Sequence, residues 1–120
     1  MHEATIAEAL IQQVRAVLDR EGLAGRVRSV EVAVGALSGV LPDALDFAFV
    51  TLSAGTFLEG AELVLRSVPG DCLCRACGQK SPAEDLLFQC PLCGSPEITL
   101  QGGHELRLEA IELDDQASDG

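Results

Sequence analysis

The hydrophobic positions of the first twenty residues follow a helical period. Thr5 followed three residues later by Glu8 fits a capping box at a helix start. Charged residues occupy the side opposite the apolar one, so the spacing predicts an amphipathic helix from Thr5 to Glu21, with Gly22 as its stop. Its apolar side chains recur at three- and four-residue steps, at Ile6, Leu10, Ile11, Val14, Val17 and Leu18.

Two later segments alternate between apolar and polar residues, which is typical of strands. The first covers residues 26–34, with Val30, Val32 and Val34 on one face, and the second covers residues 61–68. Between them Pro42 suits the first turn of a helix. The apolar face of that helix would consist of Leu45, Ala48, Phe49 and Leu52.

The segment from His104 to Asp115 predicts a last strand. Its apolar face starts on Leu106 and Leu108 and changes phase to Ile111 and Leu113. A bulge near Ala110 would explain this slip. Residues 114–120 form an acidic tail that we expect to be disordered.

The segment between the second and the last predicted strands differs in composition and has no regular hydrophobic pattern. Residues 69–100 contain all five cysteines and four of the five prolines, without a sustained period. We expect no apolar core of its own there, so this segment needs a covalent or metal staple. Because the last strand finds no apolar partner in it, that strand should return to the sheet of the first two.

The predicted fold is therefore α+β. Helices pack on a three-stranded, mainly antiparallel sheet, and a zinc-ribbon-like module with four cysteines is inserted before the last strand. In this organisation residues 1–68 and 101–120 form one discontinuous domain, and residues 69–100 form the inserted one.

Composition and charge exclude several classes of function. The formal net charge of −11 repels phosphate backbones and argues against a nucleic-acid partner. No apolar run approaches the ~18 residues that span a bilayer, and no export signal is recognisable, so we expect a cytoplasmic protein with no membrane partner. Since no catalytic triad, phosphate-binding glycine loop or framed carboxylate pair is identifiable, we also expect no enzyme activity.

The cysteines predict a metal site. Cys74-x-x-Cys77 and Cys90-x-x-Cys93 are separated by twelve residues, and a glycine directly follows each pair. Four thiolates at this spacing favour a tetrahedral Zn²⁺ site, which is closed to substrate and therefore structural. Iron has the same ligand preference and stays an alternative, whereas disulfides are unfavourable in a reducing compartment.

Two further residues could bind metal but are not needed for this site. We expect Cys72 to be an exposed or half-buried spare thiol, the alternatives being a ligand that exchanges with Cys74 or a redox sensor. A lone histidine at a strand end, His104, is expected at the surface.

The beginning of the chain is the second candidate site. The α-amine of Met1, the His2 amide nitrogen and the His2 imidazole can close on one metal ion, with the main chain of Glu3 or another side chain as a fourth donor. Such nitrogen-rich, near-planar donors favour Ni(II) or Cu(II). The alternative is that His2 is an ordinary residue near a chain end.

Several segments together resemble one known family. The Met-His-Glu opening, "GALSGVLPDALDFAF", "GTFLEGAELVL", the two cysteine pairs and "GGHELRLEAIEL" follow the order of the HypA/HybF family of hydrogenase-maturation nickel metallochaperones. The resemblance covers nearly the whole chain. It implies that His2 is a nickel ligand, with the amine of Met1 and Glu3 beside it. It also implies that Cys74, Cys77, Cys90 and Cys93 hold zinc.

The resemblance implies a function as well. It predicts delivery of Ni(II), with a partner GTPase, to the large subunit of [NiFe]-hydrogenase, and in some organisms to urease. We expect a monomer or weak homodimer. Two other classes stay open on the residues alone: a zinc-ribbon adaptor for protein interactions without a nickel function, and a thiol redox sensor that uses Cys72.

Overall fold

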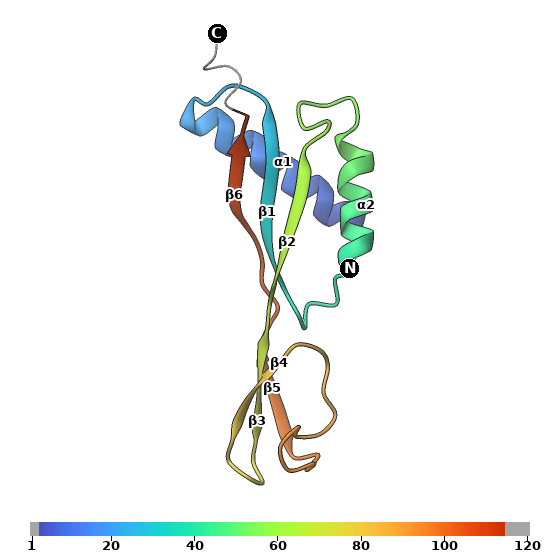
Figure 1. Cartoon of the computed structure of the whole chain (residues 1–120), viewed down its shortest axis with the longest axis vertical. Helices are drawn as coiled ribbons and strands as arrows, with labels where there is room; N and C mark the ends of the chain where they lie inside the picture. Colours follow the sequence, from blue (N-terminus) through green and yellow to red (C-terminus); the bar gives the residue numbers. More distant parts are fainter. Residues whose placement is uncertain (1–2, 115–120) are drawn as a thin grey trace. The chain divides into compact units, whose positions relative to one another are not determined.

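The computed structural model describes residues 3–114 of the chain, in two compact units (Figure 1). Unit 1 contains residues 3–32, 40–65 and 108–114, and unit 2 contains residues 33–39 and 66–107. No helix in residues 3–114 combines the length and apolar character needed to cross a bilayer.

Helix α1 (Glu3–Glu21) buries the predicted apolar face of unit 1. Its end is confirmed: Gly22 has a φ of 64°, and the amide of Leu23 bonds to the Leu18 carbonyl at 2.9 Å, which closes the last turn. The predicted capping box is wrong, because Thr5 lies inside the helix, which has already begun at Glu3. The pattern Thr5–Glu8 therefore lies within the helix, whose first turn carries the acidic residue Glu3.

Helix α2 (Pro42–Ser53) begins with proline, as predicted. Leu45 and Phe49 are fully buried and pack in the region where α2 meets α1. Leu52, which we placed on the same face, is 36% exposed. The buried face is therefore narrower than the sequence indicated.

The first sheet consists of three strands in the order β2–β1–β6. They are β1 (Val27–Gly35), β2 (Glu62–Val68) and β6 (Leu106–Leu113). Strand β6 runs antiparallel to β1, since Asp114 bonds to Arg26 at one end and Gly35 bonds to Glu105 at the other. Strand β2 runs parallel to β1 because α2 carries the chain back to the same end (Figure 1). The predicted α+β class and the return of the last strand are confirmed.

The change of phase along β6 is visible in its burial. Leu106 and Leu108 are half-buried, and Ile111 and Leu113 are half-buried on the shifted phase. The two residues between these pairs, Glu109 and Ala110, are both exposed. The bulge that would produce this pattern stays a prediction.

Unit 2 contains a second sheet, which the sequence did not predict. Strand β3 (Gly70–Cys74) pairs antiparallel with β4 (Lys80–Ala83) and with β5 (Ile98–Gly102). This second sheet is therefore antiparallel throughout.

This second sheet has an apolar core, so the expectation of none was wrong. Leu37, Cys72 and Ala83 are buried together, and Leu87, Ile98 and Leu100 pack against them. The prediction failed for two reasons. The strands are too short to show a period, and Leu37 comes from outside the cysteine segment.

Gly103 allows the backbone to approach this core closely. Its φ is 72°, and a Cβ there would lie 2.9 Å from Cγ of Leu37 and 3.0 Å from Cα of Gly70. The amide of Leu37 also bonds to the Gly103 carbonyl at 2.7 Å. Only glycine satisfies both the backbone angle and the contact.

We expect Gly103→Ala to destabilise the protein by roughly 1–3 kcal/mol more than Gly102→Ala, since overpacking adds to the backbone strain. Gly102 is a matched control because its φ is 68° and nothing lies within 4 Å of its Cβ position. Since the chain lacks Trp and Tyr, urea unfolding would be followed by circular dichroism. Equal midpoints for the two variants would contradict the packing argument.

Candidate metal centre

Each Cys-x-x-Cys pair lies in a tight backbone turn. The amide of Gly78 bonds to the Cys74 carbonyl at 2.9 Å, and the amide of Gly94 bonds to the Cys90 carbonyl at 2.9 Å. The two glycines have φ values of 75° and 79°. The sequence therefore folds locally into two similar turns, because glycine reaches these angles without a steric cost.

The two turns bring four sulfur atoms together. The four ligand atoms of Cys74, Cys77, Cys90 and Cys93 all lie within 4.8 Å of one another. The Cys74–Cys93 and Cys77–Cys90 sulfur distances are 3.6 and 3.8 Å. A tetrahedron with Zn–S bonds of ~2.3 Å has edges of about 3.8 Å. The donor set therefore fits a tetrahedral metal, and all five cysteines are free of disulfides.

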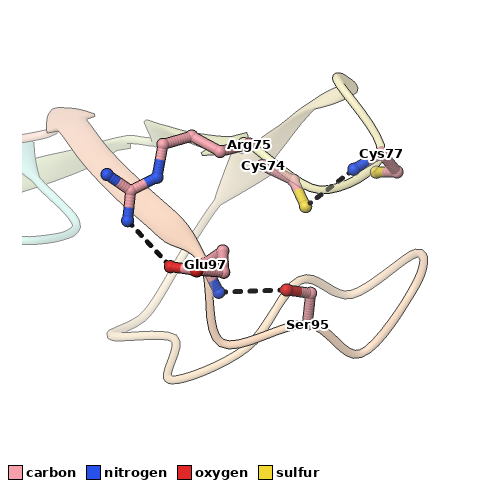
Figure 2. Close-up of polar contacts among 5 residues, drawn as sticks. All are labelled: Cys74, Arg75, Cys77, Ser95 and Glu97. Atoms are coloured by element: carbon pink, nitrogen blue, oxygen red, sulfur yellow. Dashed lines mark hydrogen bonds and ion pairs between the residues drawn. The ribbon is translucent and has the colours of Figure 1, made fainter.

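Backbone amides point at the first sulfur of each pair. The amide of Cys77 donates to Sγ of Cys74 at 3.4 Å (Figure 2). The amides of Leu92 and Cys93 donate to Sγ of Cys90 at 3.3 and 3.4 Å. Such bonds stabilise the thiolate, which is the form that binds metal.

The pKa values of the four thiols move in opposite directions. The Cys77 amide lowers the pKa of Cys74 to about 6, and the amides of Cys93 and Leu92 lower the pKa of Cys90. The amide of Ser95 also lowers the pKa of Cys93, but the Cys74 thiol and burial outweigh it and raise that pKa to about 12. Because neighbouring thiolates repel each other, all four ionise together only with a cation among them.

Contacts beyond the ligands join the two turns. Arg75 bonds to Glu97 twice, through its amide to the carbonyl at 2.8 Å and through its guanidinium to the carboxylate at 3.0 Å. The Ser95 hydroxyl accepts a bond from the Glu97 amide at 3.1 Å (Figure 2). The Ser95 carbonyl accepts one from the Cys90 amide at 2.8 Å. Sequence reasoning missed these residues, although a serine two positions before Glu97 is typical of a side-chain-capped turn.

Cys72 and His104 lie outside the cluster. Cys72 is 1% exposed, so the expected exposed or half-buried thiol is wrong: the side chain belongs to the core of unit 2. Burial first, and then the neighbouring cysteines, raise the pKa of Cys72. His104 is exposed, as predicted.

The N-terminal candidates are described only in part. Met1 and His2 lie outside the described residues. Glu3 is the first residue of α1 and is half-buried, and its carboxylate accepts a hydrogen bond from the amide of Leu41 at 3.3 Å.

We expect Cys90→Ser to lose bound zinc and to lose slow amide hydrogen exchange in β3–β5, because only three sulfur ligands remain and their thiolates repel one another once the cation is lost. Zinc content by atomic emission and exchange by mass spectrometry would measure both effects. Cys72→Ala is the matched control, because it removes a cysteine two residues from a ligand but not a ligand. Loss of zinc from Cys72→Ala would contradict the assignment of ligands.

We expect Cys72 to resist a thiol reagent at neutral pH in the zinc-loaded protein, because its side chain is buried and its pKa is raised. In an assay with a chromogenic disulfide, Cys72 should react only as slowly as the protein unfolds. Cys72→Ala should remove that slow phase. Rapid modification of Cys72 in the folded protein would restore the redox-sensor alternative.

Comparison with known proteins gives one family. Residues 1–113 match the family model described as "Hydrogenase/urease nickel incorporation, metallochaperone, hypA". A hydrogenase maturation factor HypA from Streptomyces avermitilis is 40% identical over 116 residues, covering 96% of this chain and 88% of the relative. One from Nitrosospira multiformis is 41% identical over 113 residues, covering 94% and 97%.

The solved structures support the same fold. The solution structure of the Ni metallochaperone HypA from Helicobacter pylori aligns with a TM-score of 0.63 at 23% identity. The alignment covers 94% of this chain and 97% of that one. At this identity the likeness concerns the fold alone.

Proposed function

The chain belongs to the HypA family of nickel-incorporation metallochaperones, and on that premise we propose that it binds Ni(II) at its own N-terminus. The observation that carries the proposal is the family match, which begins at residue 1 and so includes Met1, His2 and Glu3. Hydrogenase maturation is the function of the family, and the metal that the chain carries is its cargo.

The chemistry of the chain end supports nickel as that cargo. The amine of Met1 and the amide nitrogen of His2 close a five-membered chelate ring, and the amide and imidazole of His2 close a six-membered ring. The main chain of Glu3 supplies a further donor. These donors must lose protons to bind metal, so uptake and release respond to pH and to competing ligands.

The four-cysteine cluster has a different role in this proposal. Cys74, Cys77, Cys90 and Cys93 hold Zn²⁺ with no open coordination position, so the ion stabilises unit 2 and performs no chemistry. The sulfur distances and the amides that point at Cys74 and Cys90 support this assignment. The alternative of a redox sensor is disfavoured because Cys72 is buried.

The proposed partners follow from maturation of a nickel enzyme. A nickel-incorporation GTPase and the large subunit of [NiFe]-hydrogenase are the expected partners, and urease is the second possible client. We place the nickel function in the discontinuous domain of residues 1–68 and 101–120, and zinc in residues 69–100. We further propose that the protein acts in the cytoplasm as a monomer or weak homodimer and has no catalytic turnover.

We expect His2→Ala to abolish tight Ni(II) binding while zinc stays near one ion per chain, because the two sites use different donors. Isothermal titration with Ni(II) and metal analysis would measure both. A protein with extra residues ahead of Met1 should behave in the same way, since the α-amine then becomes an amide. His104→Ala is the matched control and should bind nickel like the native protein.

Two results would contradict the proposal. Native affinity in the extended protein would exclude the amine as a ligand. Native affinity in His2→Ala would exclude the chain end as the nickel site and would favour the alternative of a protein-interaction adaptor.

A further inference from the structure

Helix α2 begins without a capping side chain of its own. Its N-cap residue is Leu41, which has extended backbone angles (φ −87°, ψ 116°) and makes no side-chain cap. A leucine cannot accept hydrogen bonds, so it cannot satisfy the backbone amides at a helix start. The following residue, Pro42, has no backbone N–H, so one of these donors is absent.

An acceptor comes instead from the beginning of α1. The carboxylate of Glu3 accepts a hydrogen bond from the Leu41 amide at 3.3 Å, across 38 residues of sequence. A carboxylate there also faces the positive end of the α2 dipole. Asp43 adds a second negative charge to the same turn, but the hydrogen bond to the Leu41 amide is made by Glu3.

The bond joins two helices that already pack together. Ile6 and Leu10 on α1 are buried, as are Leu45 and Phe49 on α2, and the two helices meet in unit 1. Those contacts fix α1 from its second turn onwards. The bond from Glu3 to Leu41 adds a restraint at the first residue of the helix, directly after His2.

We propose that the Glu3 carboxylate is a positioning group for the N-terminal nickel site. Its Oε2 ties the start of α1 to the amide of Leu41, and in this proposal Glu3 contributes to the nickel site through its main chain. This inference rests on the proposed nickel function. It adds Leu41, through its amide, to the residues on which nickel affinity depends.

Four variants test the proposal. Glu3→Ala removes the acceptor, and Leu41→Pro removes the donor while leaving Glu3 intact. Proline at this position requires a shift of about 20° from the native φ of −87°. Leu41→Ala keeps the amide and is the matched control, and Glu3→Gln keeps an oxygen that accepts a weaker bond.

We expect Glu3→Ala and Leu41→Pro to bind Ni(II) about five- to tenfold more weakly, the loss expected for one charge-assisted hydrogen bond near the surface. Leu41→Ala should match the native protein, and Glu3→Gln should restore most of the affinity. At saturating nickel, all four should show the native ligand-field absorption spectrum, because the donor set is unchanged. In nickel-free Glu3→Ala, the Leu41 amide should exchange with deuterium faster than in the native protein.

Two outcomes would overturn the proposal. A changed nickel spectrum in Glu3→Ala, together with native affinity in Leu41→Pro, would make the carboxylate a ligand. Native affinity in both variants would show that the bond positions nothing. Failure of the proposed function is read separately, from native nickel binding in His2→Ala, while exchange of the Leu41 amide still reports on the hydrogen bond.

Discussion

The mutual repulsion of four thiolates is the constraint on which unit 2 depends. Two backbone turns bring the sulfurs of Cys74, Cys77, Cys90 and Cys93 within 4.8 Å of one another. Amide groups stabilise Cys74 and Cys90 as thiolates, but proximity raises the pKa of Cys93 to about 12. A divalent cation removes the conflict, since it favours the charged form of every ligand at once. The small apolar core around Cys72 then adds to a framework that the metal holds.

The two proposed metal sites differ in how readily they exchange their ion, as a metal carrier requires. Four sulfur ligands in a closed tetrahedron leave no position through which a ligand could enter, so exchange is slow and the ion is structural. A chelate made from an amine, an amide and an imidazole is open, and protonation competes with the metal. A protein can therefore keep one ion for stability and release another, without confusing the two, because each metal prefers its own donors.

The contact between Glu3 and Leu41 bears on the nickel site that we propose at the chain end. A terminus is ordinarily poorly ordered unless the fold ties it down. Here the first described residue is both the start of a helix and the acceptor for an amide of another helix. Packing against α2 positions α1, and the hydrogen bond from the Leu41 amide to the Glu3 carboxylate restrains the first turn of α1.

The sequence by itself determined the features that repeat over short distances. The helical period predicted α1, the alternation predicted β1, β2 and β6, and the spacing of two glycine-followed cysteine pairs predicted the metal cluster. The Met-His-Glu opening and the order of the segments indicated the family. The periods and the cysteine spacing are local signals, because each depends on residues that are near neighbours along the chain. The family resemblance needs only the order in which such segments follow one another.

Only the tertiary structure decided what distant residues do to one another. Cys72 is buried because Leu37 and Ala83 come to it from other segments. Strands β3, β4 and β5 have four or five residues each, too few for a period, and their pairing defines them. Thr5 is helical rather than a cap because α1 has already started at Glu3, whose carboxylate bonds to Leu41 across 38 residues. Such contacts have no periodic signature, since loop closure and packing bring them together only when the chain folds.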